Sequence, residues 1–346
     1  MQTDNKPTLN THVAGQKRSA LKIISYFLIT LGLLIAVFLG GLYFFLMKPM
    51  MTEGKPLIVE VKANSTASAL VQYLYNNGYI QSKPLIQNYI KYKGLANHLK
   101  AGVYQIQPGE SAPNFIDRIV KGDVLTAAFR IIEGSNVYQV QQKLLQAPYL
   151  NYQSDDWATV IGNYSSAEGL LLADTYHYDA GSDAKRLLLH ANKSLLAILN
   201  SNWETRSPGL PYKTPYELLI VASILEKETS LPSERRIVGG IVVNRLKKRM
   251  PLQMDPTVIY GLGPSFSGKL GHHNLDYDSP YNTYRYRGLP PTPIAMVGRD
   301  AIDAAAHPKF SDYLYFVAKG DGTHIFSKTY EEQKKAIARY MNKEHE

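Results

Sequence analysis

The hydrophobic positions of the chain begin with an uninterrupted run from Ile23 to Met47 that contains no charged side chain. At a rise of about 1.5 Å per residue, a helix of this length exceeds the roughly 30 Å thickness of a bilayer core. The run ends in Met47-Lys48-Pro49-Met50, which offers no small-residue site for signal-peptide cleavage. The pattern predicts a permanent single-pass transmembrane helix over 23–47.

The charges that flank this run indicate its orientation. Basic residues outnumber acidic ones before the run, where they are Lys6, Lys17, Arg18 and Lys22, and the excess after it is smaller. Because positive flanks stay on the cytoplasmic side, residues 1–22 are expected to be a cytoplasmic tail. The rest of the chain would then lie beyond the membrane. It contains no cysteine, which excludes disulfides and a thiol nucleophile and fits an oxidising compartment such as a periplasm.

Residues 51–123 show the short hydrophobic segments of a small α/β module. We expect a strand at 57–61, helices at 66–77 and from residue 82, and a returning strand at 102–106. This strand–helix–helix–strand order resembles the LysM unit, a glycan-binding fold of cell-wall proteins. A plain spacer domain fits the pattern nearly as well.

Residues 124–346 are expected to form a larger mixed α+β domain. The pattern predicts a strand at 127–132, a hairpin pairing 313–317 with 324–326, and helices near 138–145, from 214, from 233 and from 329. Residues 149–164 have no clear period. The segment 253–293 is rich in Gly, Pro, Tyr and Asn with little periodicity, and its aromatic content favours a binding cleft over disorder.

One helix of this domain has clear start signals and an apolar surface nearly all round. Thr214 can act as the N-cap, Pro215 takes the first helical position, and Glu217 completes a capping box. The residues 218–225 are too apolar for a single stripe, so the helix is expected to be buried.

Glu226 is placed at the C-terminal end of that helix. At 100° per residue it projects beside Leu219 and Ala222, on the buried surface. The apolar setting, the negative end of the helix dipole and nearby Glu228 all favour a protonated carboxyl, whereas Lys227 points off that side. A carboxylic acid protonated near neutral pH is what acid cleavage of a glycosidic bond requires. On periodicity alone, a glutamate in the last turn of a helix is more often salt-bridged or half-exposed than catalytic.

The formal charge is +9, from 38 basic and 29 acidic residues. The basic residues are scattered, and the largest cluster, within 245–249, lies at one helix end. A domain anchored outside the membrane has little access to nucleic acid, so anionic lipid or an acidic cell-wall polymer is the expected partner.

The sequence predicts neither a metal site nor a cofactor. His272 and His273 are adjacent and diverge on a helix or strand, and no His-Glu-x-x-His occurs. The segment 263–269 matches the start of a phosphate loop, but Leu270 stands where Ser or Thr should bind magnesium.

Several motifs in this order resemble the signature of the MltG/YceG-type endolytic murein transglycosylases. They are ASILEKET (222–229), LQMDPTVIYG (252–261), YNTY (281–284), GLPP (288–291), AAHP (305–308) and YLYFV (313–317), with LKAGVY (99–104), EG (168–169) and DTY (174–176) upstream. The family is membrane-anchored and cuts nascent peptidoglycan strands internally, between N-acetylmuramic acid and N-acetylglucosamine. For this chain, with its main domain expected in a periplasm, the anchor is expected in the lipid of the inner membrane. The resemblance implies the same substrate here, and association with cell-wall synthases of elongation and division.

The resemblance also implies a mechanism in which one glutamate, matched by Glu226, serves as acid and then as base. The sugar's own C6 hydroxyl closes on C1, which leaves a 1,6-anhydro end without water. A hydrolytic muramidase would instead need a second carboxylate, for which Asp255 or Asp174 is available. A non-catalytic glycan-binding scaffold is the other alternative.

The aromatic and amide-rich segment supplies the expected substrate-binding residues, which are Gln253, Asp255, Tyr281, Asn282 and Tyr284. Their chemistry suits sugar hydroxyls, N-acetyl groups and ring faces, although a loop-stabilising role is as well supported for each. Glu228 is expected to tune Glu226 or to brace the helix end. The segment 171–173 departs from the family pattern, which affects only local substrate contacts.

Overall fold

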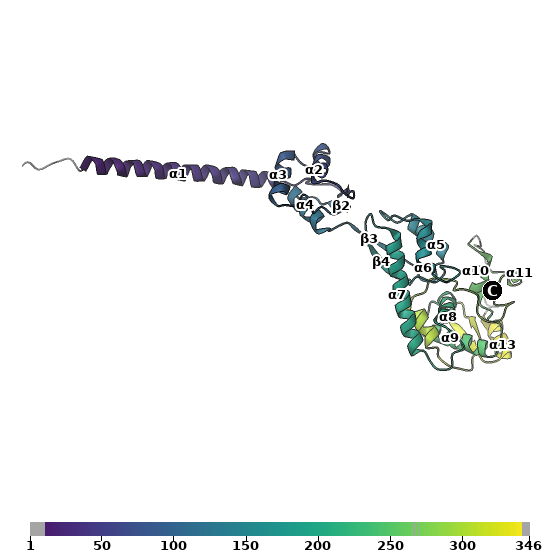
Figure 1. Cartoon of the computed structure of the whole chain (residues 1–346). Coiled ribbons are helices and arrows are strands. Elements are labelled where there is room, and N and C mark those ends of the chain that lie inside the picture. The colour runs from purple at the N-terminus through teal and green to yellow at the C-terminus, as the bar shows by residue number, and fades with distance from the viewer. Residues whose placement is uncertain (1–10, 265, 267, 269, 341–346) are drawn as a thin grey trace, which may run out of the picture. The chain divides into compact units, whose positions relative to one another are not determined.

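The computed structural model describes residues 11–340 except 265, 267 and 269, with side chains described from residue 22 onward. The chain divides into two compact units, Met1–Leu125 and Thr126–Glu346. Figure 1 labels the elements of both. Helices accompany three two-stranded sheets, which confirms the expected mixed α+β composition.

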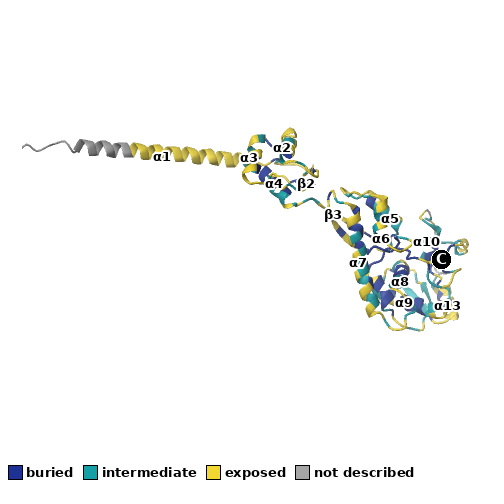
Figure 2. Cartoon of the chain, viewed as in Figure 1, coloured by how far each residue is buried: buried dark blue, intermediate teal, exposed yellow. Residues whose placement is uncertain are grey.

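The first unit opens with α1 (Thr11–Leu46), which already begins inside the expected tail. Its segment Lys22–Leu46 has a mean hydropathy of 2.5 and no part of it is buried, so it is long and apolar enough to cross a membrane. Figure 2 draws this segment in the yellow of exposed residues. By length and composition it matches the span predicted at 23–47.

The rest of the first unit is a small module joined directly to α1. Strands β1 (Leu57–Val61) and β2 (Gly102–Ile106) pair antiparallel, with α2 (Ala67–Asn76) and α3 (Lys83–Tyr92) between them in the chain. These four elements confirm the predicted order. A further helix, α4 (Ala112–Lys121), was not predicted, and its buried Phe115 and Ile116 belong to the same core.

Main-chain hydrogen bonds hold the short joint between α1 and this module. The Met50 N–H donates to the Glu110 carbonyl at 2.8 Å, and the Gly109 N–H donates to the Met51 carbonyl at 2.8 Å. Pro49 also forms an isolated β-bridge with Ser111. The chain that leaves α1 is therefore fixed to the edge of the module.

The second unit contains a peripheral layer and a helical core. The peripheral layer pairs β3 (Thr126–Arg130) antiparallel with β4 (Thr175–Asp179). It also includes α5 (Val137–Leu145), η1 (Ser154–Trp157), α6 (Ala158–Ile161) and the long α7 (Ala184–Thr205). Strand β3 and α5 confirm predictions, whereas β4 and α7 were missed and the unassigned 149–164 proves partly helical.

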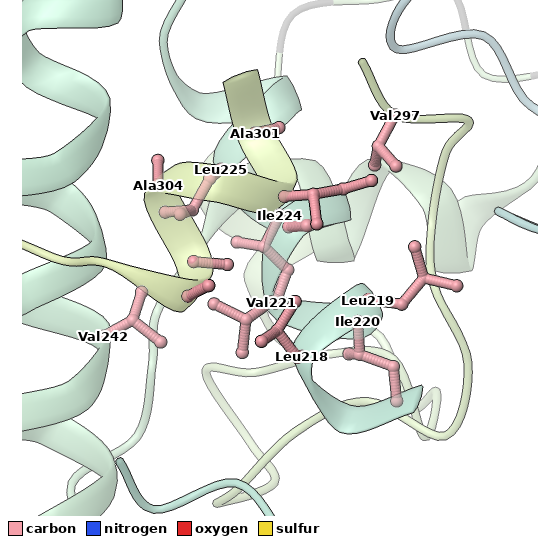
Figure 3. Close-up of a cluster of buried hydrophobic side chains, with 14 of the residues drawn as sticks. Leu218, Leu219, Ile220, Val221, Ile224, Leu225, Val242, Val297, Ala301 and Ala304 are labelled. Carbon is pink, nitrogen blue, oxygen red and sulfur yellow. The ribbon is translucent and has the colours of Figure 1, made fainter. Parts of the chain in front are cut away.

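The core of this unit surrounds α8 (Pro215–Glu228), in which every residue from Leu218 to Leu225 is buried. Helices α9 (Pro232–Lys247) and α12 (Arg299–Ala306) pack against it, and Figure 3 shows Val242, Ala301 and Ala304 among the α8 side chains. The prediction of an all-round buried helix is confirmed.

The start of α8 follows the sequence except in one detail. The Thr214 hydroxyl accepts from the Glu217 N–H at 3.1 Å, as expected of an N-cap. The Glu217 carboxylate, however, accepts from the N–H of Lys213 rather than from that of Thr214. The expected reciprocal capping box is therefore wrong by one residue.

The segment 253–293 is less irregular than expected, because it contains α10 (Asp255–Leu262) and the short α11 (His272–Leu275). Residues 265, 267 and 269 of the phosphate-loop-like stretch lie outside the described residues. The predicted hairpin is confirmed as β5 (Tyr315–Ala318) and β6 (His324–Ser327), and α13 (Tyr330–Tyr340) follows the predicted Thr329–Glu332 capping box.

Candidate active site

The last turn of α8 carries two glutamates, Glu226 and Glu228, that face different neighbours. Residues two positions apart on a helix point about 200° apart around its axis. The two carboxyl groups therefore leave the helix on nearly opposite sides. Their surroundings differ accordingly.

Glu226 is held by hydrogen-bond donors at both carboxylate oxygens. Its side chain is 3 % exposed, Oε1 accepts from Arg235 Nη2 at 3.0 Å, and Oε2 accepts from the Gly298 N–H at 2.9 Å. Burial raises the pKa of Glu226, while Gly298 and Arg235 oppose the rise. The two donors stabilise the ionised form of Glu226 and so limit the rise that burial causes.

The carboxylates that favour the proton on Glu226 differ from the expected one. The charges of Glu133 and Asp300 raise its pKa, and Glu228 has no part in this effect. Lys227 does point away as expected, since its Nζ donates to the Gly134 carbonyl at 3.2 Å.

Within the part of the chain that the structure describes, Glu228 lacks such donors. Its Oε1 is buried without a hydrogen-bond partner among the described residues, although the residue as a whole keeps some exposed surface. Burial raises the pKa of Glu228 to about 8, the negative charge of Asp255 adds to the rise, and Arg245 opposes it. At neutral pH this carboxyl group holds its proton.

Arg245 is the cation on this side of α8, and its position follows from the pattern of α9. It lies three and four residues after the buried Val242 and Ile241, and hence on the buried face of the helix. Its Nε donates to the Leu314 carbonyl at 2.7 Å and its Nη1 to the Leu252 carbonyl at 2.8 Å. Reading 245–249 as one basic cluster at a helix end missed this buried guanidinium; its helical spacing was the signal.

Three of the expected binding residues gather around Arg245 and Glu228. Gln253 Oε1 accepts from Arg245 Nη1 at 3.1 Å, and the Tyr284 hydroxyl donates to Asp255 Oδ1. Gln253 has a φ of +51°, a strained conformation for a residue with a side chain and one that is common at functional sites. Gln253 and Asp255 are exposed, so the cluster opens to solvent above the buried Glu228.

The other two expected binding residues lie elsewhere in the segment. The Tyr281 ring packs against Tyr260 with centroids 4.7 Å apart, and its hydroxyl bonds to Thr292 at 2.9 Å. Asn282 is fully buried; its Nδ2 donates to the carbonyls of Leu275 and Tyr277. Its contacts therefore support the loop-stabilising alternative.

A groove of about 480 Å³ lies beside the cluster, lined by residues of α5, the end of α8 and α10. Its wall includes Lys227, which stands between the two glutamates, and Pro256, which follows Asp255. Within the described ranges, no group of three or more His, Asp or Glu side chains is arranged to hold a metal ion.

The sequence of this chain matches a known family over most of its length. The profile of the YceG-like family matches residues 59–339. The chain belongs to the YceG-like family. This confirms the resemblance drawn from the motifs.

YceG-like relatives with curated names support the same assignment. An endolytic murein transglycosylase of Bacillus subtilis is 31% identical over 338 residues, which cover 89% of this chain and 92% of the relative. An endolytic murein transglycosylase of Streptococcus pneumoniae is 25% identical over 83% of this chain, which spans 59% of that protein. The crystal structure of a YceG-like protein from Listeria monocytogenes is similar with a TM-score of 0.51 and 28% identity, covering 82% of this chain and 99% of that one.

Proposed function

We propose that this protein is a membrane-anchored lytic transglycosylase that cuts peptidoglycan glycan strands internally. The family match and the names of relatives that cover most of the chain support the reaction class. The observation that carries the proposal is the buried Oε1 of Glu228, unpartnered among the described residues, beside a cluster of the exposed Gln253 and Asp255 with the half-buried Tyr284.

Of the two glutamates at the end of α8, the contacts favour Glu228 as the acid over Glu226, which the sequence suggested. Both oxygens of Glu226 already accept hydrogen bonds from strong donors. Glu228 has a free buried oxygen and a pKa raised to about 8, so at neutral pH it has a proton to give. If Glu226 were the acid instead, Glu226→Gln would lose activity and Glu228→Gln would keep it.

The proposed reaction requires a single carboxyl group. Glu228 protonates the glycosidic oxygen between N-acetylmuramic acid and N-acetylglucosamine while the bond to C1 breaks through an oxocarbenium-like state. The Glu228 carboxylate then takes the proton of the C6 hydroxyl, and O6 bonds to C1. Arg245 lowers the cost of that temporary carboxylate, whereas Asp255 favours the return of the proton.

A hydrolytic muramidase is the second candidate, because the charge of Asp255 acts directly on Glu228. Hydrolysis pairs an acid with a second carboxylate that attacks C1 or activates water. Asp174 is less suited to this role, since it is half-exposed and paired with Arg299 at 3.6 Å. The hydrolytic product would be heavier than the anhydro product by one water.

The proposed setting is the inner membrane, with α1 as a single-pass anchor in contact with lipid, residues 1–22 in the cytoplasm and the second unit in the periplasm. The apolar Lys22–Leu46 segment and the basic residues before it support this topology. The β1–α2–α3–β2 order supports a LysM-like, glycan-binding role for the first unit. Association with cell-wall synthases is part of the proposal on the strength of the family resemblance.

The test compares Glu228→Gln with Glu226→Gln in the full chain, using purified uncrosslinked glycan strands and mass analysis of the fragments. We expect anhydro-ended fragments from the wild type and a loss of about 10²–10⁴-fold in rate for Glu228→Gln. Glu226→Gln, corrected for its folded fraction, should retain most of the activity. The reverse pattern would move the acid to Glu226, and full activity of both variants would refute the enzymatic proposal.

A further inference from the structure

Glu168 is a third buried carboxyl group in the second unit, and it joins two helices. It is 3 % exposed; both of its oxygens lie 3.2 Å from the Val137 N–H at the start of α5, and the Tyr260 hydroxyl of α10 donates to Oε2 at 3.1 Å. Burial raises the pKa of Glu168 to about 7, against the opposing effect of these donors. The mechanism above leaves this group without a role.

The backbone around Glu168 is fixed relative to α8. Gly169, the next residue, has a φ of +73°, and a Cβ there would lie 2.4 Å from the Cβ of Pro293. The residue after that proline, Ile294, donates its N–H to the Ser223 hydroxyl in α8 at 3.0 Å. Glu168 therefore has a set position with respect to the helix that carries the proposed acid.

The two helices that Glu168 joins form walls of the groove of about 480 Å³. This volume lies in the usual range of roughly 300–1,000 Å³ for small-ligand sites. Tyr138, 51 % exposed, offers an aromatic face from α5, Gln139 offers an amide beside it, and Tyr260 lies on the α10 side. Aromatic faces with a few amides suit an N-acetylated sugar ring, whose apolar face stacks while its acetamido group accepts and donates hydrogen bonds.

The groove also lies next to the proposed acid. Lys227 and Pro256 line it. Lys227 directly precedes Glu228 in the chain, and Pro256 directly follows Asp255. Consecutive Cα atoms are about 3.8 Å apart. A sugar held in the groove would therefore lie close to the turn of α8 that carries Glu228.

We propose that this groove is a separate subsite that binds an N-acetylated sugar of the glycan strand beside the cleaved bond, with Glu168 as its positioning residue. This proposal rests on the proposed function for the identity of the ligand. Glu168 acts through its hydrogen bonds to Val137 and Tyr260, which keep the α5 and α10 walls at a fixed separation. It takes no part in proton transfer to the substrate.

Direct binding tests this subsite without any cleavage. In the Glu228→Gln full chain, affinity for a hexamer of N-acetylglucosamine is measured before and after Tyr138→Ala, which removes the stacking face. The matched control is Phe310→Ala, because Phe310 is also 51 % exposed and lies outside the groove. We expect about a tenfold weaker affinity for Tyr138→Ala and no change for the control. Equal affinity of the two variants overturns the proposal.

The role of Glu168 is read from steady-state cleavage in the otherwise unmodified chain. Glu168→Ala should raise KM several-fold while leaving kcat and the pH dependence of kcat close to wild type. A loss in kcat with unchanged KM would make Glu168 part of the chemistry and overturn its positioning role. If the wild type cuts no strands while Tyr138→Ala still weakens hexamer binding, the proposed reaction fails and the subsite stands.

Discussion

The two sides of the last turn of α8 are built from similar side chains, but in the described part of the chain only one of them supplies hydrogen-bond donors to its glutamate. On the side of Glu226, a carboxylate meets Arg235 at 3.0 Å and a backbone N–H at 2.9 Å. On the side of Glu228, Arg245 donates its hydrogen bonds to backbone carbonyls and to Gln253. The Glu228 carboxyl accepts no hydrogen bond from the described residues. Burial raises the pKa of both groups, and only for Glu226 do the described residues supply hydrogen-bond donors that oppose the rise.

The difference also separates structural from chemical roles. The Glu226 contacts join α8 to α9 and to the residue before α12, three elements of one core. A buried ion pair adds little stability over apolar side chains of the same size, but removing one partner is strongly destabilising because it leaves a buried charge unpaired. Glu228 adds no such connection, and its burial costs stability that a functional role would explain.

The largest expected effect is on stability, from Glu226→Ala. Removing this carboxylate leaves the buried Arg235 without its charge partner, which typically costs about 3–5 kcal/mol of unfolding free energy. Denaturant unfolding of the full chain, followed by a probe in the second unit, measures it. A loss below about 1 kcal/mol would show that the ion pair does not hold these helices together.

The second expected effect is a pH-dependent change in the free energy of unfolding, caused by Glu228→Gln. The folded pKa of Glu228 is raised from 4.5 to about 8. Below pH 4.5 the group is protonated in both folded and unfolded chains, so it does not affect stability. Between these values only the folded chain holds the proton, so wild-type stability falls as pH rises, and above about 8 the full penalty applies.

Glu228→Gln should therefore be more stable than wild type by on the order of 4 kcal/mol at pH 8, with the advantage shrinking to near zero by pH 4.5. Thermal unfolding across this pH range provides the measurement, and the acid end serves as the internal control. An advantage that is the same at both pH values would contradict a raised pKa for this group.

The smallest effect concerns Asp255, whose charge helps to keep the proton on Glu228. In the wild type, kcat/KM should fall as pH rises through about 8, because the acid form is lost. Asp255→Asn removes a negative charge and lowers the pKa of Glu228, so the residual activity should fall at a pH up to about one unit lower. Asp312→Asn, at an exposed carboxylate, is the matched control. If kcat/KM falls at the same alkaline pH in Asp255→Asn as in the wild type, the charge of Asp255 does not control the pKa of Glu228.

The sequence predicted the framework of this site better than its partners. The apolar run 218–225 and the Thr214 cap specify a buried α8, because both signals are local. The projection of Glu226 onto the buried surface was also right. Its partners Arg235 and Gly298, however, come from 9 and 72 residues away, and helical spacing carries no information about such contacts.

Two further elements show why the remainder was missed. Helix α10 begins at Asp255-Pro256 within a Gly-, Pro- and Tyr-rich segment, where composition obscures a short helical period. Strand β4 is recognised only through its antiparallel pairing with β3, as in Phe129 opposite Tyr176. Both depend on contacts with parts of the chain that lie far away in sequence.

Main-chain hydrogen bonds fix Met50 and Met51 to the module, so the free linker after the end of α1 is very short. On the proposed topology, the module would lie close to the outer leaflet of the membrane. It could then meet only polymer that has just left the bilayer surface, and older layers of the wall would stay beyond its range.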